Sequence, residues 1–145
     1  MARARRSTKT FSARWGVDVV ERLDRRSESA RTSKSELAER YVDEGLRMEA
    51  HPGIVFRGGP AGRRAALVGG PDVWELISFV KGLDERGQAA IEKAAELLNL
   101  RPHQVRAATG YYAEFRDEID ERIKRNAEQA EAAEAAWRRE QAALA

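Results

Sequence analysis

Two hydrophobic periodicities follow one another near the N-terminus. In residues 8–14, TKTFSAR, the positions Lys9, Phe11 and Ala13 alternate with Thr10, Ser12 and Arg14. A period of two predicts a β-strand. From Val17 onward the apolar residues take helical spacing, so we expect a helix from Asp18 to about Ser27. The sequence therefore predicts one short strand followed directly by a helix.

A second helix is predicted within "TSKSELAERYVDEGLRMEA", residues 32–50. Thr32 or Ser33 is the expected N-cap, and Glu36 follows Ser33 by three residues, which is the spacing of a capping box. The apolar positions Leu37, Tyr41 and Leu46 form one stripe along it.

The remaining chain predicts a hairpin and four more helices. Two short apolar runs, Ile54–Phe56 and Ala65–Val68, are separated by Gly and Pro and indicate a β-hairpin. Helical patterns follow over 72–83, 87–100 and 102–115, and an Ala-, Glu- and Arg-rich segment without Pro or Gly runs from 117 to the end. The expected core of this part is Val73, Trp74, Ile77, Leu97, Leu98, Val105 and Tyr112.

The lone N-terminal strand requires a partner. A unit of some 45 residues buries too little surface to stand alone, and a single strand leaves the backbone groups on both its edges unpaired. Both problems disappear if two chains intertwine, with each strand pairing antiparallel with its copy. The ribbon would carry Phe11, Ala13 and Trp15 on or near one face and polar, basic side chains on the other. A two-stranded ribbon of this kind fits the major groove of DNA.

Charge supports a polyanionic partner for the N-terminal end. The chain of 145 residues has a net charge of +2, but residues 1–34 hold ten Lys and Arg against four Asp and Glu. No acid precedes Asp18. Such an end suggests binding to a nucleic acid. A disordered, solvated arm remains an equal alternative for residues 1–6.

Composition excludes several other classes. The 42% apolar and 34% charged composition is typical of a soluble chain, and no apolar run approaches the ~20 residues of a membrane helix. No apolar stretch follows "MARARR" to make it a secretory signal. Cysteine is absent, so there is no disulfide framework or thiolate chemistry. We expect a cytoplasmic protein.

The segment "KTFSARWGVDVVERLDRRSESARTSKSELAERYVDEGL" resembles the ribbon–helix–helix family of bacterial transcription factors, the Arc, MetJ and CopG group. The resemblance implies base reading by three alternating strand residues, and phosphate binding at the start of the second helix. The base readers fall on Thr10, Ser12 and Arg14, and the phosphate contacts on Thr32, Ser33, Lys34, Arg5, Arg6 and Lys9.

Both implied roles are physically sound, since Arg chelates guanine and a helix N-terminus attracts phosphate. The sequence departs from the pattern in two ways. Thr10 and Ser12 are short readers, which suggests modest specificity or a reliance on DNA shape. Arg26 stands where an apolar residue is expected.

Residues 51–123 resemble a small bacterial domain family without assigned function that is often encoded as an antitoxin component. The likeness lies in "HPG", "DVWE" and the spacing around "TGYY", and implies a fold similar to a winged helix. "LNLRPHQVRAA" predicts a helix, a tight turn and a helix with Pro102 at its first position. Two interpretations remain, an exposed helix around a core or a second DNA contact through Arg101, His103, Gln104 and Arg106.

Other candidate chemistry is weak. "RGGPAGRR" lacks the Gly-Lys-Ser/Thr ending of a phosphate-binding loop. We interpret it as the tip of the hairpin. The less favoured alternative places its arginines, Arg57, Arg63 and Arg64, near a DNA backbone. The two histidines, His51 and His103, lie far apart without companion ligands at metal spacing. We therefore expect no enzyme activity, no cofactor and no metal.

The last 22 residues, 124–145, form the predicted helical tail. Ile123, Ala130, Trp137 and Leu144 recur every seven residues, so an apolar side needs a surface to contact. Packing on the protein itself or its twin is one interpretation. The other is docking to a partner; antitoxins of the ribbon–helix–helix type wrap a toxin, which implies roles for Trp137, Arg138, Arg139 and Leu144.

The sequence thus predicts a mainly α-helical protein with three parts. These are a ribbon–helix–helix homodimer over 1–50 with a basic arm at 1–7, a winged-helix-like domain over 51–123, and the tail. The expected function is sequence-specific repression of transcription, as an autoregulating antitoxin of a toxin–antitoxin pair. The alternative is a dimeric interaction or scaffold protein that does not touch DNA.

Overall fold

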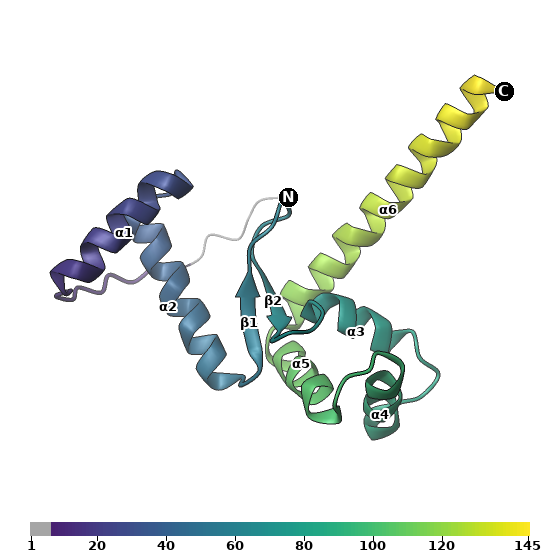
Figure 1. The fold of residues 1–145 in the computed structure, drawn as a ribbon, viewed down its shortest axis with the longest axis horizontal. Coiled ribbons are helices and arrows are strands. Elements are labelled where there is room, and N and C mark those ends of the chain that lie inside the picture. The colour runs from purple at the N-terminus through teal and green to yellow at the C-terminus, as the bar shows by residue number, and fades with distance from the viewer. Residues whose placement is uncertain (1–6) are drawn as a thin grey trace. The chain divides into compact units, whose positions relative to one another are not determined.

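The computed structural model describes residues 7–145, which are mainly helical, as the sequence predicts. They form six helices and one two-stranded antiparallel sheet (Figure 1). The elements are α1 Val17–Ala30, α2 Lys34–Ala50, β1 Ile54–Arg57, β2 Arg64–Leu67, α3 Val73–Lys81, α4 Gly87–Leu97, α5 Pro102–Glu114 and α6 Arg116–Leu144. The chain divides into two compact units at Asp43 and Glu44, within α2.

The N-terminal unit consists of α1 and the first part of α2. α1 ends at Ala30 and is followed by Arg31, whose φ of 51° is left-handed, and α2 begins with the predicted capping box. The Glu36 N–H donates to Ser33 Oγ at 3.2 Å, and the Ser33 N–H donates to the Glu36 carboxylate at 3.3 Å. Leu37 is fully buried, but α1 has no buried residue at all. The unit therefore leaves much of its apolar surface uncovered.

The predicted strand over 8–14 is not formed in the single chain, where residues 7–16 belong to neither helix nor strand. A strand requires a backbone partner, and the predicted partner is the same segment of a second copy. The ribbon therefore stays a prediction.

The C-terminal unit opens on the predicted hairpin. β1 pairs with β2 in a register that places Ile54 opposite Leu67 and Arg57 opposite Arg64. The hairpin packs against α3 and α5. α3 then starts with a capping box between Asp72 and Glu75, and Pro102 begins α5 as predicted.

The core of this unit corrects the predicted set at one position. Val73, Ile77 and Val105 are buried, and Trp74, Leu98 and Tyr112 pack against the core while partly exposed. The prediction that Leu97 lies in the core is wrong, because its side chain is 54% exposed at the last position of α4. The largest fully buried side chain is instead Tyr111, the neighbour of the predicted Tyr112. A shift of one position turns a helical residue by about 100°, so adjacent tyrosines cannot share one environment.

α6 has two different halves. Its first turns pack on α3 and α5 through Ile119, which is 4% exposed, and Ile123. From Lys124 onward every side chain is exposed except Ala136, which is half-buried. Figure 1 shows this second half, in yellow, extending away from the rest of the C-terminal unit. Among residues 7–145, no helix has both the length and the apolar character that crossing a membrane requires.

The corrected core makes a direct prediction. Leu76→Ala removes a side chain that is 1% exposed, so the free energy of unfolding should fall by about 2–5 kcal/mol through lost burial and a cavity. Leu97→Ala is the matched control and should cost less than about 1 kcal/mol. Denaturant unfolding at one fixed protein concentration measures both. Equal losses for the two variants would contradict the assignment of the core.

Candidate nucleic-acid interface

The three predicted base readers lie together on the extended N-terminal segment. Thr10, Ser12 and Arg14 are exposed, as is Lys9. Within residues 7–145 the Arg14 guanidinium has no ion-pair partner. Arg5 and Arg6 lie outside the described residues. The segment thus offers hydroxyl and guanidinium groups that are free to meet a ligand.

The predicted phosphate site lies at the turn between α1 and α2, and its groups are partly engaged. Thr32 is half-buried, donating from its backbone N–H to Ser27 O at 3.2 Å and from Oγ1 to Ala30 O at 3.2 Å. Lys34 Nζ lies 2.6 Å from an Asp24 carboxylate oxygen, but both side chains are about half exposed. An exposed ion pair of this kind is weak, so Lys34 can exchange its partner for a phosphate.

The Ser33 hydroxyl is the hub of the α2 capping box, because it both accepts from the Glu36 N–H and lies 3.1 Å from the Glu36 carboxylate. The first N–H groups of a helix have no acceptor within it. The turn therefore keeps backbone donors at its surface, with a carboxylate from Glu36 beside them.

Arg26 stands where an apolar residue is expected, and its contact with Tyr41 explains the polar side chain at this position. A hydrogen bond from Arg26, assisted by Arg40, holds the pKa of the Tyr41 phenol below its ordinary value. The Arg40 guanidinium also lies over the Tyr41 ring, 5.3 Å from its centre. Arg26 is thus used on the α1–α2 surface as a polar contact in place of apolar packing.

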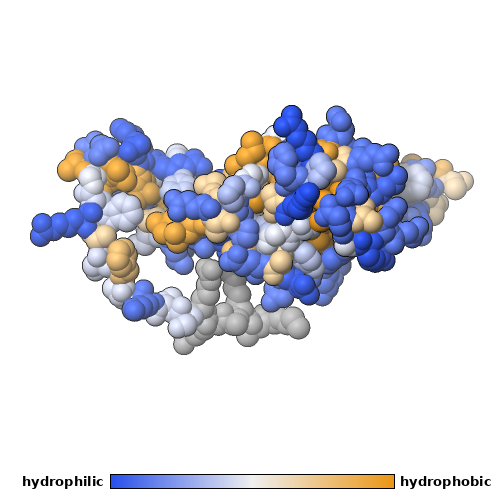
Figure 2. Space-filling model, turned by 90° about the horizontal axis from the view of Figure 1, so that it is seen from below, coloured by the Kyte–Doolittle hydropathy of each residue, from blue (hydrophilic) through white to orange (hydrophobic). Residues whose placement is uncertain are grey.

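Apolar side chains are exposed around these polar groups. In the N-terminal unit they are Phe11, Trp15, Val17, Tyr41 and Val42, and Val17 is 74% exposed. Figure 2 shows hydrophobic surface interleaved with hydrophilic surface over this unit, on the left. These side chains leave apolar surface of this small unit uncovered in the single chain.

The second predicted contact lies where α5 begins. Arg101, His103 and Arg106 are exposed, while Gln104 is half-buried. The Gln104 side chain accepts a hydrogen bond from the Arg101 N–H at 2.8 Å. Gln104 is therefore occupied in capping α5, and only the other three present free polar ends.

The hairpin arginines, which the sequence left as an alternative DNA contact, are engaged by groups of the same unit. Arg63 binds the buried Glu44 carboxylate with two hydrogen bonds of 2.6 and 2.7 Å. Arg64 pairs with Asp72, and Arg57 lies 3.5 Å from the same carboxylate. Arg122 holds the hairpin tip by donating to Ala61 O and Arg63 O. Asp72 is thus shared by Arg57 and Arg64, and Glu44 is held by Arg63.

The predicted tail residues lie on one exposed helix. Trp137 is 59% exposed and Leu144 is 83% exposed. Arg138 pairs with Glu134 one turn earlier, and Arg139 is exposed. Both apolar side chains of the tail are therefore largely uncovered.

A polar network that the sequence did not reveal joins the end of α2 to the α5–α6 junction. Arg47 donates to Tyr111 Oη at 2.8 Å and to Glu118 at 2.7 Å, and Tyr111 Oη donates to the same carboxylate at 3.0 Å. His51 Nε2 lies 2.8 Å from a Glu114 oxygen. Arg47 and His51 lie more than 60 residues before their partners in the chain, so no local pattern could have shown these contacts.

The titration behaviour of the network is structural in origin. Burial, reinforced by the nearby Glu118 charge, raises the pKa of Tyr111 above its ordinary value. Burial would lower the pKa of Arg47, but its bonds to Glu118 and Tyr111 outweigh that effect and raise it. Tyr111 thus stays protonated and Arg47 charged, as a fixed clamp requires.

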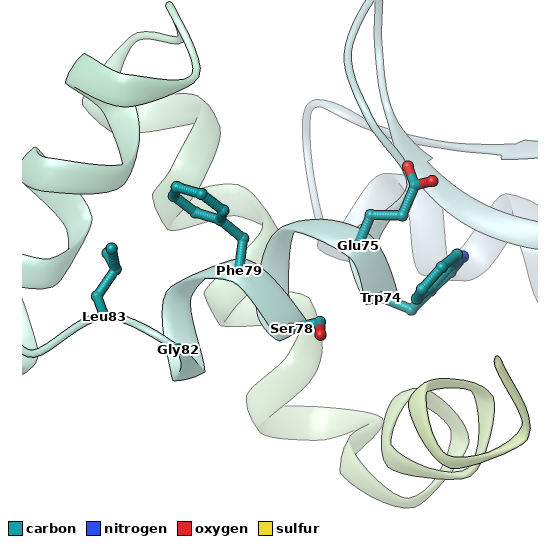
Figure 3. Close-up of a pocket in the computed structure, with 6 residues that line it drawn as sticks. All are labelled: Trp74, Glu75, Ser78, Phe79, Gly82 and Leu83. Carbon is teal, nitrogen blue, oxygen red and sulfur yellow. The ribbon is translucent and has the colours of Figure 1, made fainter. Parts of the chain in front are cut away.

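A shallow hollow of about 450 Å³ lies along α3. Figure 3 shows the residues that line it, which are Trp74, Glu75, Ser78, Phe79, Gly82 and Leu83. Its one carboxylate, Glu75, accepts from the Asp72 N–H in the capping box. Within residues 7–145, no three His, Cys, Asp or Glu side chains are grouped so that they could hold a metal ion.

Comparison with known proteins finds no counterpart. No family model matches the chain, and neither a curated protein nor a solved structure matches it.

The capping role of Ser33 can be tested directly. Ser33→Ala removes the Oγ that accepts from Glu36, so the free energy of unfolding should fall by about 1 kcal/mol. Ser35→Ala makes the same chemical change in the first turn and should stay within about 0.5 kcal/mol of the parent. Chemical unfolding of both variants at one fixed concentration is the measurement. An unchanged stability for Ser33→Ala would contradict the capping assignment.

Proposed function

We propose that this chain is a sequence-specific DNA-binding repressor of transcription that acts as a ribbon–helix–helix homodimer. The observation that carries the proposal is the combination of an exposed, acid-free basic segment with an amphipathic α1 that buries no residue in the single chain. The basic segment favours binding to a polyanion, and the uncovered apolar side of α1 favours association with a second copy of the chain.

Dimer formation follows from the apolar surface. Val19, Val20 and Leu23 of α1 are only partly covered, and Val17 is largely exposed. Burying such surface stabilises by about 25 cal/mol per Å². Two copies that share it also bring their extended segments together, so that each completes the other's sheet edge. Stability then depends on protein concentration.

The DNA contact follows from the paired segments. An antiparallel ribbon places alternate side chains on one face, so Thr10, Ser12 and Arg14 from both copies would point into the major groove. Arg14 supplies the guanine contact. Phosphates on either side would meet the start of α2, where Lys34 exchanges its exposed pairing with Asp24.

The exposed tail supports the antitoxin role. Residues 124–145 hold Trp137 and Leu144 away from any cover supplied by the C-terminal unit. An amphipathic helix of this kind suits docking into a groove of a partner protein. A toxin bound there, with the repressor on its own operator, would make the pair autoregulating. The winged-helix-like interpretation of residues 51–123 belongs to the same proposal.

The alternative is a dimeric scaffold protein whose N-terminal unit only associates. The exposed apolar surface supports it as well as it supports a repressor. The two functions differ in what Arg14 does.

Arg14→Ala separates the two functions. If the ribbon reads DNA, the affinity for the duplex upstream of the protein's own coding sequence should fall about tenfold or more, and the slope of log affinity against log salt should become shallower. A scrambled duplex of equal length reports non-specific binding. Titrations by fluorescence anisotropy over a salt series measure all of these quantities.

Arg116→Ala is the matched control, because it removes the same charge from an exposed position at the start of α6. It should leave DNA binding unchanged. Equal affinities and slopes for the parent and Arg14→Ala would contradict DNA reading by the ribbon and favour the scaffold.

Deletion of residues 126–145 tests the tail. The shortened chain keeps Ile119 and Ile123, which pack on the core, so it should keep its fold and its DNA affinity. It should lose the protein that the full chain binds when co-expressed with its neighbouring gene. Retention of that same protein, measured by co-purification, would contradict partner docking on the tail.

A further inference from the structure

α4, a four-residue connection and α5 form a helix–turn–helix. α4 ends at Leu97, α5 begins at Pro102, and the turn is shaped by Asn99, whose φ is 52°. The Leu100 N–H donates to Ala95 O at 2.9 Å and closes the end of α4. A tight turn with one left-handed residue is typical of helix–turn–helix motifs, whose second helix enters the major groove of DNA.

The two helices are held together by an inner face of small and β-branched side chains. Ala94 and Ala95 on α4, with Val105 and Ala108 on α5, are each at most 4% exposed. Leu98 and Leu100, on either side of Asn99, pack against the same core. The orientation of α5 is therefore fixed by packing, as a reading helix requires.

The outer face of α5 carries basic side chains in its first half and small residues in its second half. His103, Arg106, Gly110 and Ala113 are all exposed and are spaced three or four residues apart, so they share one side of the helix. No Asp or Glu lies between Glu96 and Glu114. Neither Arg101 nor Arg106 has an acidic partner among residues 7–145, in contrast to the hairpin arginines.

Gly110 is the least expected residue on this face. A glycine inside a helix costs about 0.5–1 kcal/mol relative to alanine, and nothing within 4 Å would meet a Cβ at this position. Packing inside the molecule therefore gives no reason for it. A bare helix surface beside Arg106 does allow the wall of a groove to approach closely.

We propose that α5 is a second DNA-reading element, which lies in the major groove with Arg106 on a base edge and Arg101 on the backbone. Arg106 would donate to guanine O6 and N7, and the His103 N–H in the first turn of α5 would add to the Arg101 phosphate contact. The inference extends the proposed function from one reading element to two, and it rests on α5 and not on the ribbon.

The test selects bound duplexes from a random pool with the full chain and its variants. The parent should enrich a sequence with base preferences at two separate groups of positions, one for each reading element. Arg106→Ala should erase a guanine preference that Arg14→Ala retains, and should weaken binding to the selected duplex about tenfold. Arg116→Ala, which removes the same charge from an exposed position at the start of α6, should enrich the parent sequence. Circular dichroism and thermal unfolding confirm that each variant is folded.

Gly110→Glu is a second, independent variant. It places a negative charge on the same face of α5, where the fold leaves open space. It should therefore remove the base preference at the same positions of the selected sequence as Arg106→Ala does, without loss of thermal stability. If both variants enrich the parent sequence with parent affinity while Arg14→Ala does not, the α5 proposal is overturned and the ribbon stands. If only the two α5 variants alter the sequence, the ribbon fails and α5 stands. A parent that enriches nothing overturns both.

Discussion

The apolar surface that α1 leaves uncovered is the constraint on which the proposed account depends. α1 is amphipathic but buries no residue in a single chain, and only Leu37 of the neighbouring α2 segment is fully enclosed. A unit of this size gains too little from its own packing to offset the entropy of ordering its backbone. Association of two copies would supply the missing burial, and would also give the extended segment at residues 8–14 a strand to pair with. One interaction would then create both the stable unit and the ribbon.

The C-terminal unit meets the same physical demand in a different way. It has its own core around Tyr111, and a charged clamp from Arg47 to Glu118 fixes the end of α2 to the α5–α6 junction. Its hairpin arginines pair with Glu44 and Asp72. Arg14 on the N-terminal segment and Arg101 and Arg106 on α5 have no such acidic partner among residues 7–145. These three exposed guanidinium groups are the ones that the proposal assigns to DNA.

Local patterns in the sequence predicted the helices, the hairpin and the α2 capping box, because each depends on residues a few positions apart. The Ser33–Glu36 spacing and Pro102 at the start of α5 are the clearest examples. Leu97 was predicted as core because it is apolar and helical, but the end of α4 faces solvent there. The Arg47–Tyr111–Glu118 network and the pairing of Arg63 with Glu44 could not be predicted, since they join segments that only the tertiary fold brings together. The strand over 8–14 differs again, because its predicted partner belongs to another molecule.

The central claim is that two copies pair through the segment at residues 8–14, and amide hydrogen exchange combined with the solution mass tests it most directly. We predict the mass of two chains, with slow exchange at alternate amides of this segment that becomes fast on dilution below the dissociation constant. A single-chain mass, or two chains with fast exchange throughout residues 8–14 at every concentration, would contradict the ribbon.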